Sequence, residues 1–201
     1  MKKISLILAV VMLFASMLTF CACGKDGNGD ETGGEASKAI APKDAVIKDM
    51  VAAIEEDAPY AEYVSEFLYK AEDPDEMLCW TYGVIDIKGY ELLDDYVITM
   101  PSDYSQSLAI IKFKDGMTAD DFAEVKEVVT TEYIKVRASQ LQMYMPDQYK
   151  NMSWALENPD KIWRQYGDNM LVLAIYGGEE ATHVWEAIDE YLAGEYVAEA
   201  E

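Results

Sequence analysis

The chain has 201 residues, of which 51% are hydrophobic and 27% charged, and its 38 acidic against 16 basic residues give a net charge of −22. A surface of this charge repels nucleic acid and other polyanions, so we exclude those partners and consider cationic or neutral ones. With only three cysteines the chain has no disulfide framework, and its stability must come from an apolar core.

The N-terminal residues have the pattern of a bacterial lipoprotein signal. Two lysines precede a charge-free run from Ile4 to Phe20, and small residues flank Cys23. A cationic head, a short apolar segment and a small residue before a cysteine are typical of a signal peptide that is cleaved and lipidated. We therefore predict a signal peptide over 1–22, lipidation at Cys23, and a lipid-anchored location on the extracytoplasmic face of the cell membrane.

Two alternatives stay open for this segment. Lipidation at Cys21 would place bulky Phe20 at the cleavage site, which is why we favour Cys23. An uncleaved transmembrane anchor would need roughly 20 apolar residues, and the apolar run is marginal for that. Residues 24–43 lack aromatic side chains and are rich in Gly, Lys, Asp and Glu, so we predict that 23–43 is a lipidated cysteine and a flexible tether.

The remaining sequence predicts a single domain over 44–195, followed by an acidic tail over 196–201. Apolar residues at helical spacing predict helices over 44–57 and 60–71, and a short helix over 73–83. The first of these helices would bury one stripe of side chains, formed by Val46, Ile47, Met50, Val51 and Ile54. Cys79 lies between Leu78 and Trp80, which favours a small buried side chain over a reactive nucleophile.

After residue 95 the pattern of apolar residues becomes typical of strands. Residues 96–100 and 108–113 are rich in β-branched and aromatic side chains, which predicts a strand pair. Thr118 and Asp121 resemble a capping box at the start of a long helix that ends at the Tyr144-Met145-Pro146 segment. The buried face of that helix is predicted from its apolar spacing to contain Phe122, Val125, Val129, Tyr133 and Val136.

A second strand pair and a last helix follow. Residues 161–166 and 170–176 are predicted strands, joined by a Gly167-Asp168-Asn169 hairpin turn. The last helix spans about 179–193 and ends at Gly194. The order predicts an α+β fold with N-terminal helices followed by two β-β-α units. We expect an antiparallel sheet of about four strands, with the helices covering one of its faces.

Several short motifs over 75–192 resemble a known family. They are Tyr82-Gly83-Val84, the Tyr96-Val97-Ile98 strand before Pro101, the Ala109-Ile110-Ile111-Lys112 strand before Lys114-Asp115-Gly116, Tyr144-Met145-Pro146-Asp147-Gln148-Tyr149 and Tyr166-Gly167-Asp168. In this order they resemble the uncharacterised lipoproteins of domain of unknown function family 4358, chiefly from Gram-positive anaerobes. The resemblance implies architecture and location, and it implies no activity or catalytic residues.

Motifs for known chemistry are missing from the sequence. There is no HExxH, P-loop, GxGxxG or GxSxG, so we predict no cofactor and no serine triad. The single histidine, His183, is expected to be exposed, and with Glu179 and Glu186 it falls on one helical face. A metal site there would lack a fourth ligand, so we predict no metal. Clustered acids leave open a carboxylate-dependent hydrolase or weak calcium binding.

The aromatic residues after the long helix are the best candidates for a binding site. Tyr144, Pro146, Gln148 and Tyr149 fall in a segment that we predict to be a loop, and aromatic side chains in a loop favour a binding surface. The alternative is a helix terminator, in which Pro146 stops the helix and Gln148 bonds to free backbone groups.

These observations predict a surface-anchored, non-enzymatic binding or accessory module. Its expected partners are the membrane, through the lipid anchor, and an extracytoplasmic protein or small ligand. A carboxylate-dependent hydrolase acting on cell-surface polymer and a purely structural envelope lipoprotein are the alternatives. Two close carboxylates in a pocket would favour the hydrolase, whereas an exposed apolar patch at Tyr144 and Tyr149 would favour the binding module.

Overall fold

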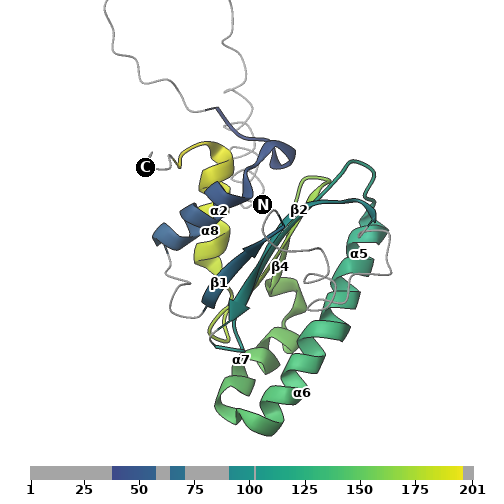
Figure 1. Cartoon of the computed structure of the whole chain (residues 1–201), viewed down its shortest axis with the longest axis vertical. Coiled ribbons are helices and arrows are strands. Elements are labelled where there is room, and N and C mark those ends of the chain that lie inside the picture. Colours follow the sequence, from purple (N-terminus) through teal and green to yellow (C-terminus); the bar gives the residue numbers. More distant parts are fainter. Residues whose placement is uncertain (1–37, 58–63, 71–90, 102, 197–201) are drawn as a thin grey trace, which may run out of the picture. The chain divides into compact units, whose positions relative to one another are not determined.

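The computed structural model describes residues 38–57, 64–70, 91–101 and 103–196, all of which belong to one compact unit, Ser37–Glu201. The predicted signal peptide, Cys21, Cys23, most of the tether, Cys79, the helix expected over 73–83 and the acidic tail from 197 onward lie outside the described residues. Figure 1 shows an α+β fold in which helices pack against one sheet. The helical segments are η1 (Pro42–Asp44), α2 (Ile47–Asp57), α5 (Ala119–Val128), η4 (Val129–Ile134), α6 (Lys135–Tyr144), α7 (Pro146–Glu157), η5 (Pro159–Lys161) and α8 (Thr182–Ala193).

The sheet has five strands in the order β1-β2-β3-β5-β4, and all neighbouring strands are antiparallel. The strands are β1 (Val64–Tyr69), β2 (Leu93–Pro101), β3 (Ser107–Phe113), β4 (Trp163–Tyr166) and β5 (Met170–Ile175). The two predicted strand pairs are confirmed as the hairpins β2–β3 and β4–β5, which meet where β3 pairs with β5. Gly167, with φ of 59°, supplies the left-handed conformation in the β4–β5 turn.

The helix predicted over 60–71 is wrong, because Val64–Tyr69 forms β1 at the edge of the sheet. Its apolar side chains pack on both faces of the sheet. Leu68 belongs to one core cluster, whereas Phe67 and Tyr69 pack against the other. Such a strand has no alternation of apolar and polar residues, so its apolar spacing resembled that of a helix.

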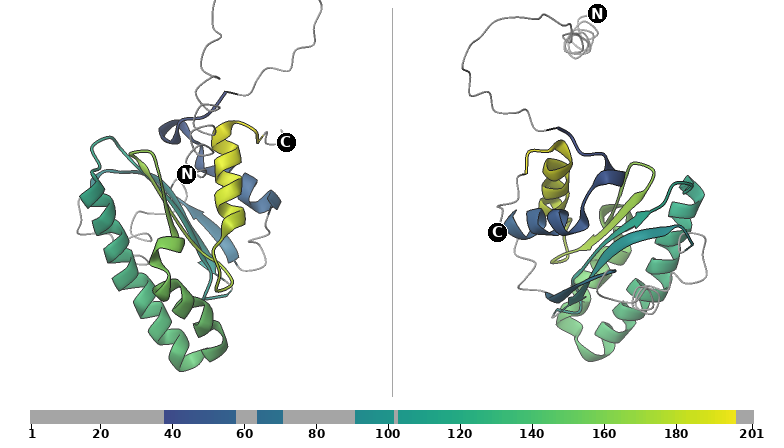
Figure 2. Two further views of the ribbon diagram at one scale, coloured as in Figure 1. Left: turned by 180° about the vertical axis from the view of Figure 1, so that it is seen from behind. Right: turned by 45° about the horizontal axis from the view of Figure 1, so that its top comes forward.

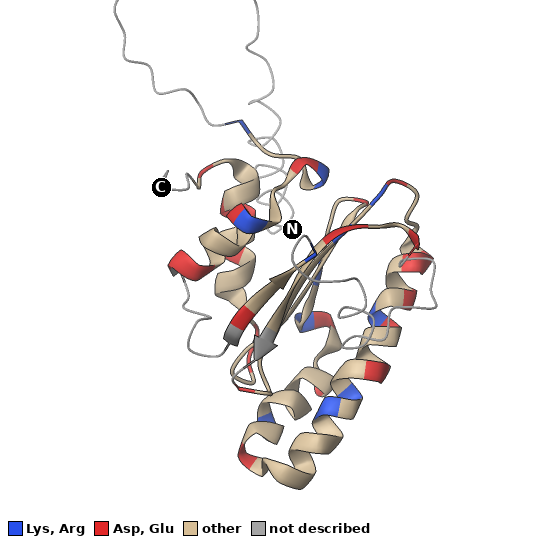
Figure 3. Ribbon diagram, in the orientation of Figure 1, with Lys and Arg blue, Asp and Glu red and all other residues tan. Residues whose placement is uncertain are grey.

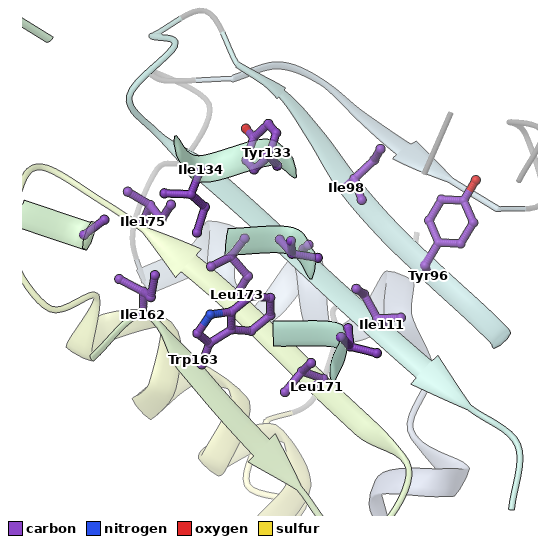
Figure 4. Close-up of a cluster of buried hydrophobic side chains, with 14 of the residues drawn as sticks. Tyr96, Ile98, Ile111, Tyr133, Ile134, Ile162, Trp163, Leu171, Leu173 and Ile175 are labelled. Atoms are coloured by element: carbon purple, nitrogen blue, oxygen red, sulfur yellow. The ribbon is translucent and has the colours of Figure 1, made fainter. Parts of the chain in front are cut away.

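Helices cover both faces of the sheet, which corrects the expectation that they cover one (Figures 1 and 2). The cluster that contains Ile111 and Leu173 packs beneath α5, η4, α6 and α7, and part of it is drawn in Figure 4. The cluster that contains Ile110 and Val172 packs beneath α2 and α8. Every residue of β3 and β5 is therefore buried, as expected for central strands enclosed by two helical layers.

The predicted long helix is confirmed in extent but is not a regular α-helix. The capping box at its start is present, with Thr118 Oγ1 accepting a hydrogen bond from Asp121 N–H and the Asp121 carboxylate accepting one from Thr118 N–H. Its middle, η4, is a π-helix of six residues. A π turn contains one more residue than an α turn, so two residues five positions apart, Val129 and Ile134, are both buried. Val136, which we expected to be buried, is consequently 47% exposed.

The last two helices agree with the sequence prediction to different degrees. α7 was not predicted. It begins with Pro146 as its first helical residue and buries Met152 and Ala155 against the sheet. α8 is confirmed and ends at Gly194, whose φ is 74°, but it begins at Thr182, later than expected. Val46, which we expected on the buried stripe of the first helix, comes just before α2 and is exposed, and its N–H donates to the Tyr191 hydroxyl of α8.

Candidate functional site

The predicted binding loop at 144–149 is a tight corner between two helices, which corrects the loop expectation. α6 ends at Tyr144 and α7 begins at Pro146, so Met145 alone connects them. Met145 N–H donates to Leu141 O at 2.8 Å, and Met145 O accepts from Gln148 N–H and Tyr149 N–H, both at 3.1 Å. These bonds satisfy one carbonyl at the end of α6 and two N–H groups at the start of α7, and they fix the direction of the corner.

Large apolar side chains are exposed at this corner. Tyr144 is 76% exposed, Met143 71% and Met145 40%. An apolar side chain in water gains nothing for folding, so three consecutive ones on a well-bonded corner suggest a surface that another molecule covers. Figure 3 shows that the ribbon around this corner is mostly tan, with few acidic residues.

The other predicted binding residues have different surroundings. Pro146 is exposed and starts α7. Tyr149 is half-buried and packs against the core cluster beneath α5 and α7, so it is a structural residue. Gln148 is half-buried, and its Oε1 has no hydrogen-bond partner among the described residues. The structure thus separates Tyr144 on the surface from Tyr149 at the core.

A pocket of about 380 Å³ opens beside Tyr144, and we call it the corner pocket. Tyr144, Met145 and Leu141 supply its apolar wall, and Tyr104, Arg137 and Gln140 complete the lining. The Arg137 guanidinium lies over two aromatic rings, 5.2 Å from the centroid of Tyr104 and 5.5 Å from that of Tyr133. Stacking holds the guanidinium in place while it keeps its hydrogen-bond donors, so the pocket combines an aromatic wall with one fixed cation.

Hydrogen bonds outside the pocket hold its two sides together. Tyr104 comes from the β2–β3 turn, in which Ser105 N–H and Oγ both donate to the Asp103 carboxylate, at 2.9 and 2.7 Å. Asn151 of α7 donates to Ser105 Oγ at 3.0 Å, and Tyr133 of η4 donates to Ser107 Oγ at 3.2 Å. The turn is thereby tied to the helices that carry the other walls.

Sequence reasoning found Tyr144 but missed Tyr104, Arg137 and Gln140. The only signal for Arg137 and Gln140 was their place two turns and one turn before Tyr144 on a helix, since residues three, four and seven positions apart share a face. No local signal connects Tyr104 with them, because a tertiary contact between a hairpin turn and α6 brings them together.

His183, the only histidine of the chain, lies near the start of α8 and packs against an aromatic ring. It is half-buried, unlike the exposed position we expected, and its ring packs edge-on against Tyr176 with centroids 4.5 Å apart. Burial lowers the pKa of His183 below its ordinary value of 6.5, and the charges of Glu179 and Glu186 oppose that shift. Within the described ranges, no group of three or more His, Cys, Asp or Glu side chains could hold a metal ion.

Comparison of the chain with known protein families, with curated proteins and with solved structures found no match. None of the helices in the described residues is long and apolar enough to cross a membrane.

Proposed function

We propose that this chain is a lipid-anchored, extracytoplasmic, non-enzymatic binding module that holds a protein partner at the α6–α7 corner. The observation that carries the proposal is the corner cluster, which we define as Tyr104, Arg137, Met143, Tyr144 and Met145. The lipid anchor rests on the signal pattern that ends at Cys23. The resemblance of its motifs to a family of uncharacterised lipoproteins supports a location on the outer side of the membrane.

The composition of the corner cluster favours a protein partner over a small ligand. Tyr, Met and Arg are among the side chains that are more frequent in protein interfaces than on other surfaces. Met143 lies outside the corner pocket and is 71% exposed, so the apolar surface continues past the pocket rim. A small ligand would leave that part in water, whereas a partner with a protruding apolar side chain would fill the pocket and cover the rim.

The two alternatives gain less support from this site. Among the described residues, no acidic side chain lines the corner pocket, so a carboxylate pair for hydrolysis is not available there. A purely structural role does not account for Tyr144, because a side chain that is 76% exposed contributes little to the free energy of unfolding.

The proposal is tested by photo-crosslinking from Met143 in the cells that produce the protein. A benzophenone amino acid replaces Met143 in the full chain, and the same amino acid replaces exposed Val46 as the matched control. We expect a discrete adduct with one protein from position 143 and none of that adduct from position 46. Tyr144→Ala should reduce the adduct about tenfold or more, as loss of an aromatic interface anchor does.

Measuring the stability of Tyr144→Ala distinguishes loss of binding from loss of folding. Tyr144→Ala should change the free energy of unfolding by less than about 0.5 kcal/mol, because the side chain is mostly in water. Absence of an adduct from position 143, the same adduct from position 46, or an adduct that survives Tyr144→Ala would each refute the proposed function.

A further inference from the structure

A second pocket lies beside the π-helix, away from the corner. Its volume is about 390 Å³, and it shares no lining residue with the corner pocket. We call it the π-helix pocket. One wall comes from the end of α5, η4 and the first residue of α6, and the other comes from η5 and the first residue of β4. This volume is at the lower end of the range for small-molecule sites.

The π turn brings Lys135, the last lining residue from this helix, toward this pocket. Lys126, Thr130, Thr131 and Lys135 line it together, and Lys135 N–H bonds to Thr130 O across the wider turn. In a regular α-helix Thr131 would share a face with Glu127, four positions before it, whereas Lys135, nine positions after Lys126, would lie on the opposite side of the helix. The extra residue of the π turn therefore brings Lys135 back toward the side of Lys126, and π turns are frequent at functional sites.

The charges around the π-helix pocket balance each other. Lys126 and Lys135 face it together with Glu127 and Asp160. Among the described residues, none of these four side chains forms an ion pair or a side-chain hydrogen bond. In a chain of net charge −22, a pocket with two cations and two anions is locally neutral.

This arrangement selects among ligand classes. A simple anion would meet the carboxylates of Glu127 and Asp160, and a simple cation would meet the two ammonium groups. A ligand that carries both charges can pair its carboxylate with the lysines and its ammonium group with the acids. The threonine hydroxyls can donate to or accept from either end.

Trp163 excludes one further class. It lines the pocket but is only 7% exposed and packs in the core among Ile162, Leu171 and Leu173 (Figure 4), so its ring is not available for a sugar to stack on. Its buried Nε1 donor has no acceptor among the described residues.

We propose that the π-helix pocket binds a small zwitterion of the amino-acid or short-peptide class. The ligand carboxylate lies between Lys126 and Lys135, and its ammonium group lies toward Asp160 and Glu127. This inference does not depend on the corner cluster or on the lipid anchor, so failure of the proposed function would leave it intact.

The first experiment compares three probes that differ only in charge. The full chain in detergent is titrated calorimetrically with the dipeptide alanylalanine, with N-acetyl-alanylalanine, which lacks the ammonium group, and with alanylalaninamide, which lacks the carboxylate. We expect alanylalanine to bind about tenfold or more tightly than either derivative, since each derivative leaves a pair of protein charges unpaired. Equal binding of the acetylated probe, equal binding of the amide, or no heat from any probe up to about 10 mM would overturn the proposal.

Variants then assign the two charges of the ligand. Lys126→Gln and Lys135→Gln should each weaken alanylalanine binding about tenfold and leave alanylalaninamide unchanged, and Asp160→Asn should weaken both probes that carry the ammonium group. Lys150→Gln and Glu190→Gln, at exposed positions outside the pocket, are the matched controls. Weakening by a control to the same extent as by a pocket variant would overturn the proposal.

Discussion

At the scale of single residues, His183 is the titratable side chain with the clearest consequence for stability. Its ring packs against Tyr176, and burial lowers its pKa below 6.5 despite the nearby charges of Glu179 and Glu186. As the pH falls through 6.5, the unfolded chain takes up a proton at this residue while the folded chain does not. The free energy of unfolding therefore decreases over that range, and the decrease ends once the pH is below the folded pKa.

We expect His183→Gln to remove this part of the pH dependence. Urea unfolding of the chain and of the variant at about pH 8 and about pH 5 gives the measurement. The original chain should lose more stability between the two values than the variant does, because the carboxylates titrate in both and cancel. An equal loss in both proteins would show that burial of His183 does not lower its pKa.

At the scale of elements, the π-helix is an insertion of one residue into an otherwise regular helix. Thr131 is exposed and lies within η4, so its deletion should convert η4 to α-helix and leave the buried faces of α5 and α6 in place. We expect a folded protein whose free energy of unfolding changes by less than about 2 kcal/mol. Far-ultraviolet circular dichroism and urea unfolding of the deletion variant provide the test.

Deletion of Glu124 is the matched control, because it is also exposed but lies in the regular helix α5. Its removal rotates the preceding turn by about 100° and takes Phe122 out of the core, which should cost about 3–5 kcal/mol. If deletion of Thr131 were as costly as deletion of Glu124, η4 would not be a single-residue insertion.

The elements that sequence reasoning found are those with strong local signals. The β2–β3 and β4–β5 hairpins, the Thr118 capping box and the Gly194 helix end all depend on neighbouring residues. β1 was misread because its two buried faces remove the alternation that identifies a strand. The exposure of Val136 was missed because nothing in the local sequence indicates a π turn.

The candidate site was predictable only in part for the same reason. Tyr144 was identified from its aromatic character next to a proline. Tyr104 lies beside it because the β2–β3 turn is bonded to α7 through Ser105 and Asn151. A contact between segments so far apart in the chain leaves no periodic pattern in either one.

At the scale of the whole molecule, the binding surface must be outside the membrane for the proposed function to hold. We expect Cys23→Ala to abolish incorporation of labelled fatty acid and to release the protein from the membrane fraction. Cys21→Ala is the matched control and should retain both properties. Loss of labelling in Cys21→Ala but not in Cys23→Ala would move the anchor to Cys21, and labelling of neither protein would leave the chain without a lipid anchor.

The pairing of β3 with β5 has a consequence for how the chain folds. Short turns close the β2–β3 and β4–β5 hairpins, but β3 ends at Phe113 and β5 begins at Met170, with α5, η4, α6, α7 and β4 between them. Closing a long loop costs conformational entropy before the favourable strand contacts form. Such non-local contacts raise the contact order and slow folding. The joining of the two hairpins is thus the step at which the topology of this sheet sets the folding rate.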